Sequence, residues 1–145
     1  MTRYPSRQRG VAAVEFAIVS SLLFTVLFGV MEMGRLLWTW NAAVEATRYG
    51  ARLAVVCDLN GSNIKSQMIS RLPSLTTGNI VITYLNPPAA DNTCTAANCK
   101  AVNVSLTNYT HNTIIPFVPL SLTLPPFSTT LRKEFMSSAA NEVCQ

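Results

Sequence analysis

Charged residues are scarce in this chain and almost missing from one long stretch near its N-terminus. Asp, Glu, Lys and Arg make up 12% of the sequence, whereas hydrophobic residues make up 49%. Between Val11 and Met31, a run of 21 residues, the one charged side chain is Glu15. A helix of about 20 apolar residues crosses the roughly 30 Å of hydrocarbon in a bilayer. The absence of charge therefore predicts a transmembrane helix over about residues 11–31.

The sequence also lacks the motifs that carry common enzyme chemistries. It has no Gly-x-Ser-x-Gly nucleophile motif, no P-loop and no paired carboxylates in residues 58–145, where the acids are scattered. His111 is the single histidine and lies in a polar stretch, so we interpret it as a surface residue. One histidine offers little toward a zinc site. We expect no catalytic residue, no metal site and no cofactor.

The net charge of +4 raises the question of nucleic-acid binding, but its distribution argues against that function. Arg3, Arg7 and Arg9 all precede the apolar run, and without them the net charge falls to +1. No cluster of Lys and Arg with interleaved aromatic residues occurs elsewhere, so we expect no nucleic-acid partner. By the positive-inside rule, the three arginines keep the N-terminus in the cytoplasm and place everything after Met31 across the membrane.

Proline is absent from residues 11–57, so one helix is expected to continue beyond the membrane. About 45 residues at 1.5 Å per residue give a length of roughly 65–70 Å. Past Met31, charged residues return at helical spacing. The spacing predicts an exposed stripe of Asn41, Glu45, Arg48 and Arg52, and a buried stripe of Leu37, Trp40, Val44, Thr47, Ala51 and Ala54.

Residues 58–145 have the pattern of a small α+β domain. A turn-forming cluster over residues 58–61 ends the long helix near Cys57. We expect a short helix from about Ser62 to Leu72, capped by Ser62 and stopped by Pro73. The predicted strands cover Asn79–Asn86, residues 102–107 and Ser128–Met136, and the prolines at 116, 119, 125 and 126 break the rest into short extended pieces. The expected fold is a long transmembrane helix followed by a small antiparallel sheet with a short helix against it.

The four cysteines all follow the apolar run, at Cys57, Cys94, Cys99 and Cys144. In an oxidising periplasm they would form disulfides, and the sequence permits three pairings. We favour Cys94–Cys99 because these residues are close in sequence, which leaves Cys57–Cys144. Loop-closure entropy makes the long loop worth roughly 4–5 kcal/mol and the short one roughly 2 kcal/mol. The four residues between Cys94 and Cys99, rather than two, favour a structural bridge over a thiol exchanger.

Glu15 is costly in an apolar segment, because a charged side chain near a bilayer centre costs about 2.5–3.5 kcal/mol on insertion scales. Two partners for its carboxylate are open. Arg7 or Arg9 can reach it by snorkelling. Alternatively, cleavage after Gly10 frees the α-amino group of Val11, and Glu15 of one subunit pairs with that amine of a neighbour. The second pairing would also fix the axial register between subunits.

Three segments of the chain carry a recognisable pattern: RQRGVAAVEFAIV, FGVMEMGRLL and NAAVEATRYGARLAVV. Together they resemble the TadE-like family of pseudopilins, the minor pilins of tight-adherence (Flp) pilus systems. The resemblance implies that a prepilin peptidase cuts between Gly10 and Val11, with residues 1–10 as the leader. It further implies a protein of the bacterial inner membrane that works with other pilins, pseudopilins and the assembly platform of an adhesive pilus. The additional domain after the helix favours a minor or tip-associated role, and the protein either enters the pilus or stays in the membrane.

Several residues along the long helix are candidates for an interface with another helix. Small residues at Gly29 and Gly34 let another helix approach closely, and the Gly50-Ala51 step is expected to do the same against the C-terminal domain. Glu32 and Arg35 are three apart, which fits either an ordinary ion pair or a subunit contact. The remaining candidates are Arg52, in the Tyr49–Arg52 segment that shares the resemblance, and the tryptophans Trp38 and Trp40, which suit either an interfacial belt or simple packing.

Two other classes of protein share the basic leader and the apolar run. An uncleaved, signal-anchored periplasmic module is the main alternative. A secreted domain with a cleaved signal peptide fits less well, because the apolar core of a signal peptide has about 7–15 residues and an A-x-A site follows it. Neither feature is present here.

Overall fold

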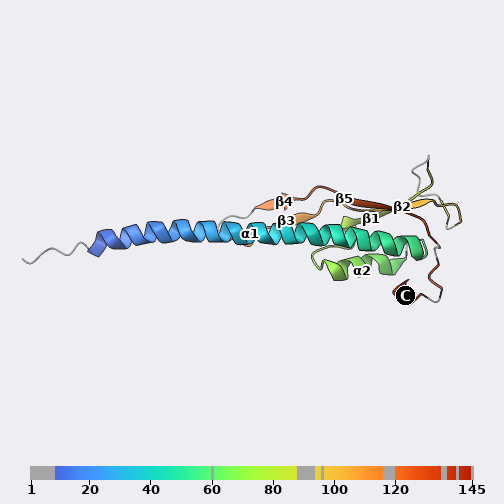
Figure 1. Ribbon diagram of the computed structural model, residues 1–145, viewed down its shortest axis with the longest axis horizontal. Helices are drawn as coiled ribbons and strands as arrows, with labels where there is room; N and C mark the ends of the chain where they lie inside the picture. Colours follow the sequence, from blue (N-terminus) through green and yellow to red (C-terminus); the bar gives the residue numbers. More distant parts are fainter. Residues whose placement is uncertain are drawn as a thin grey trace, which may run out of the picture.

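A single long helix, α1 (Arg9–Val56), dominates the computed structural model (Figure 1). It has 48 residues and no interruption, as the absence of proline predicted. The structure describes residues 9–59, 61–87, 94–95, 97–115, 120–134, 137–139 and 141–144. The expected leader lies outside these ranges except for its last two residues, Arg9 and Gly10, which form the start of the helix.

The rest of the chain forms a small domain beside the second half of α1. It contains helix α2 (Ser62–Arg71), strands β1 (Ile80–Leu85), β2 (Ala101–Leu106), β3 (Thr110–Asn112), β4 (Ser121–Thr123) and β5 (Phe127–Arg132), and the 3-10 turns η1 (Thr77–Asn79) and η2 (Glu142–Cys144). The first sheet has the order β1-β2-β5 and is antiparallel throughout. The second sheet is the β3–β4 hairpin.

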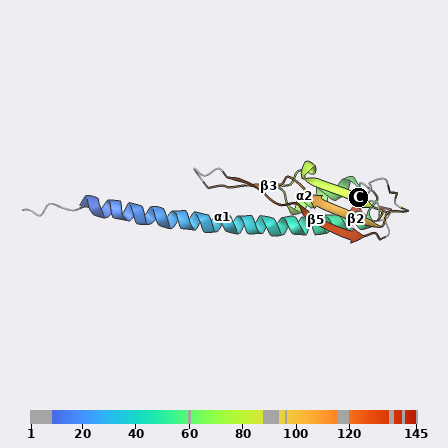
Figure 2. The ribbon, with the colours of Figure 1, turned by 90° about the horizontal axis from the view of Figure 1, so that it is seen from above.

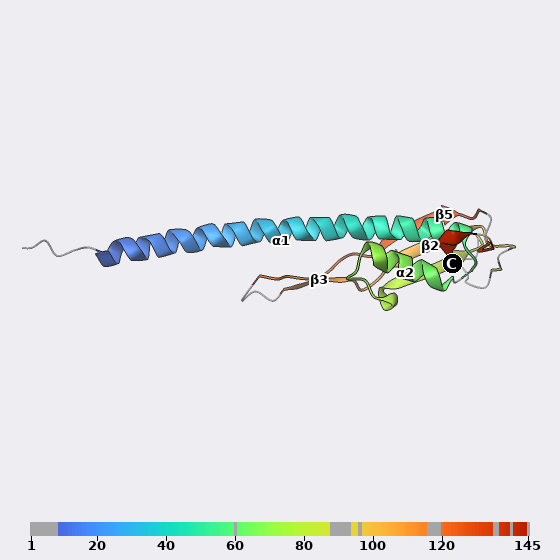
Figure 3. The same ribbon diagram turned by 90° about the horizontal axis from the view of Figure 1, so that it is seen from below.

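The domain contacts α1 from two sides. Strands β2 and β5 pack on one side of the helix and α2 packs against another (Figures 2 and 3). The hairpin β3–β4 runs back along α1 toward the apolar half of the helix (Figure 1). The predicted fold class, a long helix followed by small antiparallel sheets and a short helix, is confirmed.

Small side chains make up most of the buried face of α1. The predicted exposed stripe is confirmed, since all four of its members are exposed. The predicted buried stripe is wrong at its first two positions, because Leu37 is 57% exposed and Trp40 is 40% exposed. The sheet and α2 approach the helix from two directions, so the buried face is wider than the predicted stripe and is rotated away from Leu37 and Trp40. Its buried members are Thr39, Ala43, Ala46, Thr47, Gly50, Ala51, Leu53, Ala54 and Val55.

Gly50 marks the closest approach between α1 and α2. A Cβ placed at Gly50 would overlap the Met68 sulfur and lie 2.9 Å from its Cγ. Met68 is fully buried and shares one face of α2 with Ile64 and Leu72, at helical spacing. Gly50 therefore lies where the α2 side chain Met68 comes within contact of α1.

Two predicted elements need correction at their ends, and one hairpin was missed. Ser62 is the first residue of α2, not its cap; the cap is Gly61, without a side-chain hydrogen bond. The last strand ends at Arg132 instead of Met136, which lies outside the described residues. The hairpin β3–β4 was not predicted, because its strands have three residues each and flank a proline-containing segment. By contrast, the alternation in β2 is confirmed, since Val102, Val104 and Leu106 are all buried.

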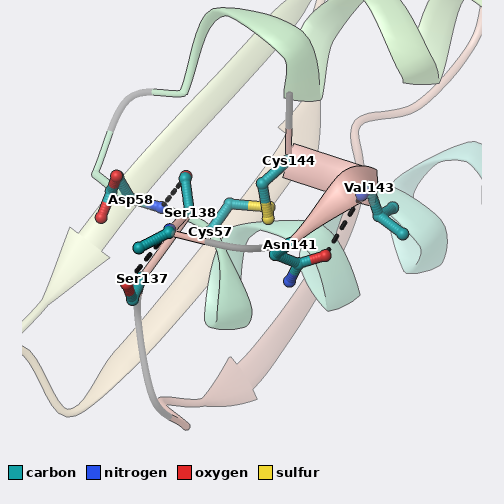
Figure 4. Close-up of a disulfide and its surroundings, with 8 residues drawn as sticks. Cys57, Asp58, Ser137, Ser138, Asn141, Val143 and Cys144 are labelled. Carbon is teal, nitrogen blue, oxygen red and sulfur yellow. Dashed lines mark hydrogen bonds between the residues drawn. A yellow bond between two sulfur atoms is a disulfide. The ribbon is translucent and has the colours of Figure 1, made fainter.

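Both disulfides have the pairing that the sequence favoured, Cys57–Cys144 and Cys94–Cys99. The first joins the residue after α1 to the end of the chain across 87 positions (Figure 4). Backbone contacts reinforce this bridge, because Ser137 N donates to Val56 O at 2.9 Å and Asp58 N donates to Ser138 Oγ at 3.0 Å. The C-terminal segment is therefore tied to the end of the long helix.

Replacing Gly50 with alanine should destabilise the protein, whereas the same change at Gly34 should not. Alanine improves helix propensity by about 1 kcal/mol at either position. At Gly34 the added Cβ meets nothing within 4 Å, so Gly34→Ala keeps that gain. At Gly50 it overlaps the buried Met68, and overpacking costs about 1–3 kcal/mol. Thermal unfolding of the detergent-solubilised protein should show a lower Tm for Gly50→Ala, and equal shifts for both variants would contradict the packing described here.

Candidate functional site

Among the residues that the structure describes, none covers the first half of α1. One described helix is long and apolar enough to cross a membrane, and its most apolar window is 0% buried. Large side chains stand fully out from it, with Phe16 74% exposed and Leu22 69% exposed. Two hydroxyls in this segment are satisfied within the helix, since Ser21 Oγ donates to Ile18 O and Thr25 Oγ1 donates to Ser21 O, both at 2.8 Å. A surface of this kind suits an apolar solvent or neighbouring helices.

Gly10, Val11 and Glu15 lie in the first turns of α1. The N–H groups of the first turn have no intrahelical acceptor, so this end of the helix opens at low cost. Glu15 is exposed, and no ion pair joins it to another described side chain. Arg7 and the side chain of Arg9 lie outside the described residues, so their pairing with Glu15 stays a prediction.

A polar cluster stands where the apolar run ends. Arg35 Nη1 donates to both carboxylate oxygens of Glu32, at 2.8 and 2.9 Å. From the hairpin, His111 Nε2 lies 3.0 Å from Glu32 Oε1, and Ile114 N donates to Glu32 Oε2 at 3.4 Å. An ionised carboxylate only accepts hydrogen bonds, so His111 carries its proton on Nε2 when Glu32 is charged. Glu32 thus joins the hairpin to α1 across about 80 positions of sequence.

His111 is the functional residue that the sequence analysis misplaced. Its predicted surface position is wrong, because the side chain is 7% exposed and packs against α1. No sequence signal links it to Glu32, since the two residues are 79 positions apart and lie on elements of different type. In β3, His111 is buried between exposed Thr110 and Asn112. A pattern of three residues is too short to be recognised in the sequence before the hairpin is known.

The surroundings of Glu32 shift its titration. Desolvation raises the pKa of the Glu32 carboxyl, but three sets of hydrogen bonds, from His111, Ile114 and Arg35, together with the charge of Arg35, lower it by more. The pKa of Glu32 therefore lies below its ordinary value of 4.5. The bonds hold the charged form in place, so the docking of the hairpin depends on that charge.

The remaining interface candidates divide into open and occupied positions. Gly29 and Gly34 are open, because an added Cβ would meet nothing within 4 Å. Arg52 is exposed, beside Leu131 and Glu134. Trp38 is 64% exposed, whereas Trp40 packs edge-on against Phe127 with ring centroids 4.9 Å apart. Subunit contact at Gly29, Gly34, Arg35 and Arg52 stays a prediction.

A polar cleft of about 460 Å³ opens beside the cluster, between α1 and the turn that leads into β3. Its walls include Arg35, Trp38 and Asn108. Hydrogen bonds within the domain already engage part of its lining, such as the 2.6 Å contact between the Ser74 and Tyr109 hydroxyls. Within the described ranges, no three His, Cys, Asp or Glu side chains come together as metal ligands.

Comparison with known proteins supports the resemblance read from the sequence. The family model described as "TadE-like protein" matches residues 10–52. That range contains Gly10, Glu15, the Glu32–Arg35 pair and Gly50, and it ends within α1. Neither the curated proteins nor the solved structures contain a match to this chain.

Acid should release the hairpin from α1 through Glu32. A carboxyl with a lowered folded-state pKa stabilises the docked form above about pH 4.5, and this stabilisation is lost as the pH falls through the folded-state pKa. Hydrogen exchange measured on peptides that cover residues 109–115 should therefore lose protection below that pH, after correction for intrinsic rates. Glu32→Gln should remove this pH dependence. Glu45→Gln, in the exposed pair with Arg48, serves as the control, and an identical response of both variants would rule out the proposed docking role.

Proposed function

From the match of residues 10–52 to the TadE-like family, we propose that this chain is a minor pilin or pseudopilin of a tight-adherence (Flp) pilus. The observation that carries the proposal is the apolar half of α1. No described segment covers it, and it continues without a break into the part of the helix that packs in a folded domain. The proposed protein crosses the bacterial inner membrane once, with the N-terminus in the cytoplasm and the domain in the periplasm. It has no catalytic role.

In this proposal, a prepilin peptidase on the cytoplasmic face cuts between Gly10 and Val11. The cut removes the leader with its three arginines and leaves a positive α-amino group on Val11. The scissile bond lies in the first turn of α1, where opening the helix breaks few hydrogen bonds. Cleavage would then release the subunit for work with other pilins and with the assembly platform.

The new amine gives Glu15 a partner in an assembled bundle. An unpaired carboxylate in a low-dielectric bundle is strongly unfavourable, and pairing with an amine of opposite charge offsets that penalty. A neighbouring helix shifted along the axis would bring its Val11 amine to Glu15. Gly29 and Gly34, which are open in the monomer, allow the close helix approach that this pairing needs.

The domain of the proposed subunit is built to move with its helix. The second half of α1 supplies part of the domain core, and the Cys57–Cys144 bridge ties the chain end to the end of α1. A force applied to the domain during assembly or retraction therefore reaches the membrane helix through packed side chains and a covalent link. The alternative function is an uncleaved, signal-anchored periplasmic interaction protein, which would use the same helix as a permanent anchor.

Intact mass separates the two functions. The full chain is expressed in membranes with and without the cognate prepilin peptidase, extracted and measured. We expect a peptidase-dependent loss that corresponds to residues 1–10. A Gly10→Leu variant is the control and should keep its leader both with and without the peptidase. Full-length protein in the presence of active peptidase would favour the uncleaved anchor.

Glu15→Gln tests the pairing in the bundle separately from cleavage. The variant should still be cut after Gly10, because the scissile bond is unchanged, but it should co-purify less with neighbouring pilins. Crosslinking of pilins in membranes, with cleavage followed by mass, measures both effects. Normal crosslinking by Glu15→Gln would refute the pairing mechanism while leaving the family match intact.

A further inference from the structure

The outer end of the β3–β4 hairpin carries exposed apolar side chains. Ile114 is 70% exposed, Leu120 is 57% exposed and Leu122 is 44% exposed, and we refer to these three residues as the hairpin patch. The hairpin ladder holds them at the end of the ribbon, since Thr113 N donates to Leu120 O at 3.0 Å and Leu120 N donates to Thr113 Oγ1 at 3.0 Å. Isolated exposed leucines are common on protein surfaces, but three in one short hairpin form a cluster.

The hairpin patch lies at the level where the apolar run of α1 ends. Ile114 N is 3.4 Å from Glu32 Oε2, and Glu32 is the first charged residue after Met31. Leu122 pairs directly with His111 across the ladder, so both side chains stand on the same face of the hairpin. His111 contacts α1 from that face. The hairpin patch therefore lies beside the end of the apolar surface of α1, at the same position along the helix axis.

The surrounding segment has no formal charge. Residues 101–131 contain no Asp, Glu, Lys or Arg, although charged residues make up 12% of the chain. Charged side chains oppose entry into the boundary between headgroups and acyl chains, and apolar side chains favour it. Trp38, exposed on α1 a short distance beyond Glu32, is of a type enriched at that boundary.

We propose that the hairpin patch rests on the lipid bilayer, at the periplasmic interface, next to the point where α1 leaves the membrane. This inference rests on the proposed membrane span of α1. The partner is lipid rather than a second copy of the chain, because the span alone brings the hairpin patch to the interface in every molecule. Because the span of α1 already holds the molecule in the bilayer, a weak affinity of the hairpin patch for lipid is enough to keep the two in contact.

A fluorescent probe in vesicles tests this contact. The described cysteines are all disulfide-bonded, so a single added cysteine can be labelled with the environment-sensitive dye NBD without reduction. The full chain, carrying Leu120→Cys, is placed in vesicles of phosphatidylethanolamine and phosphatidylglycerol. One set of vesicles contains lipids with a nitroxide near the headgroup, and a second set contains lipids with a nitroxide deep in an acyl chain. Leu22→Cys, in the middle of the expected span, reports on the span of α1, and Lys100→Cys, just before β2, reports on the exposed domain.

We expect the headgroup nitroxide to quench the probe at position 120, the deep nitroxide to quench the probe at position 22, and neither to quench the probe at position 100. Ile114→Ser added to Leu120→Cys should reduce quenching at position 120, whereas Val81→Ser, a similar change at the exposed position of β1, should not. Quenching at position 22 without quenching at position 120 overturns the inference and leaves the membrane span standing. Absence of quenching at position 22 overturns the span, and the inference with it. Energy transfer between labelled copies that rises with the protein-to-lipid ratio, without lipid quenching at position 120, identifies a second copy as the occupant and also overturns the inference.

Discussion

The close packing of the second half of α1 against two different elements is the constraint on which the domain depends. Strands β2 and β5 cover the helix from one side and α2 covers it from another, and both approach through small residues such as Ala43, Ala46 and Gly50. Without a Cβ at Gly50, the Met68 side chain fits directly against the helix backbone. A domain of this size buries a limited apolar area. Packing against α1 and the disulfide from Cys57, at the end of α1, to Cys144 therefore supply much of the stability of the domain.

The same helix also places the domain relative to the membrane. A continuous α1 leaves no flexible linker between the apolar run and the core, so the height of each domain element is fixed by its contact along the helix. The Glu32 cluster is the contact next to the apolar run of α1, because Arg35, His111 and Ile114 all bond to one carboxylate there. A satisfied carboxylate at the edge of the apolar run avoids the penalty of an unpaired charge. It also holds the hairpin along the helix.

The sequence predicted the local features of the fold and less of its packing. The helix α1, the strand β2 and the short helix α2 follow from hydrophobic periodicity and the positions of proline, which act within a few residues. The exposed stripe of Asn41, Glu45, Arg48 and Arg52 was predicted for the same reason. Leu37 and Trp40 were misplaced because burial on a helix depends on which segments cover it, and those segments come from residues 62–71 and 101–132. The hairpin β3–β4 was missed because strands of three residues carry almost no periodic signal.

By itself, the sequence determined that α1 is long, apolar in its first half and unbroken, because charge and proline content act directly on each turn of the helix. It also pointed to Glu15 beside the expected cleavage position, and to the disulfide pairing by proximity along the chain. Only the tertiary structure decided that Glu32 bonds to His111 and that the partner of Gly50 is Met68. It alone placed Ile114, Leu120 and Leu122 at the end of the apolar run. These contacts join residues many positions apart, and their geometry is set by how the sheet, the hairpin and α2 close around one helix.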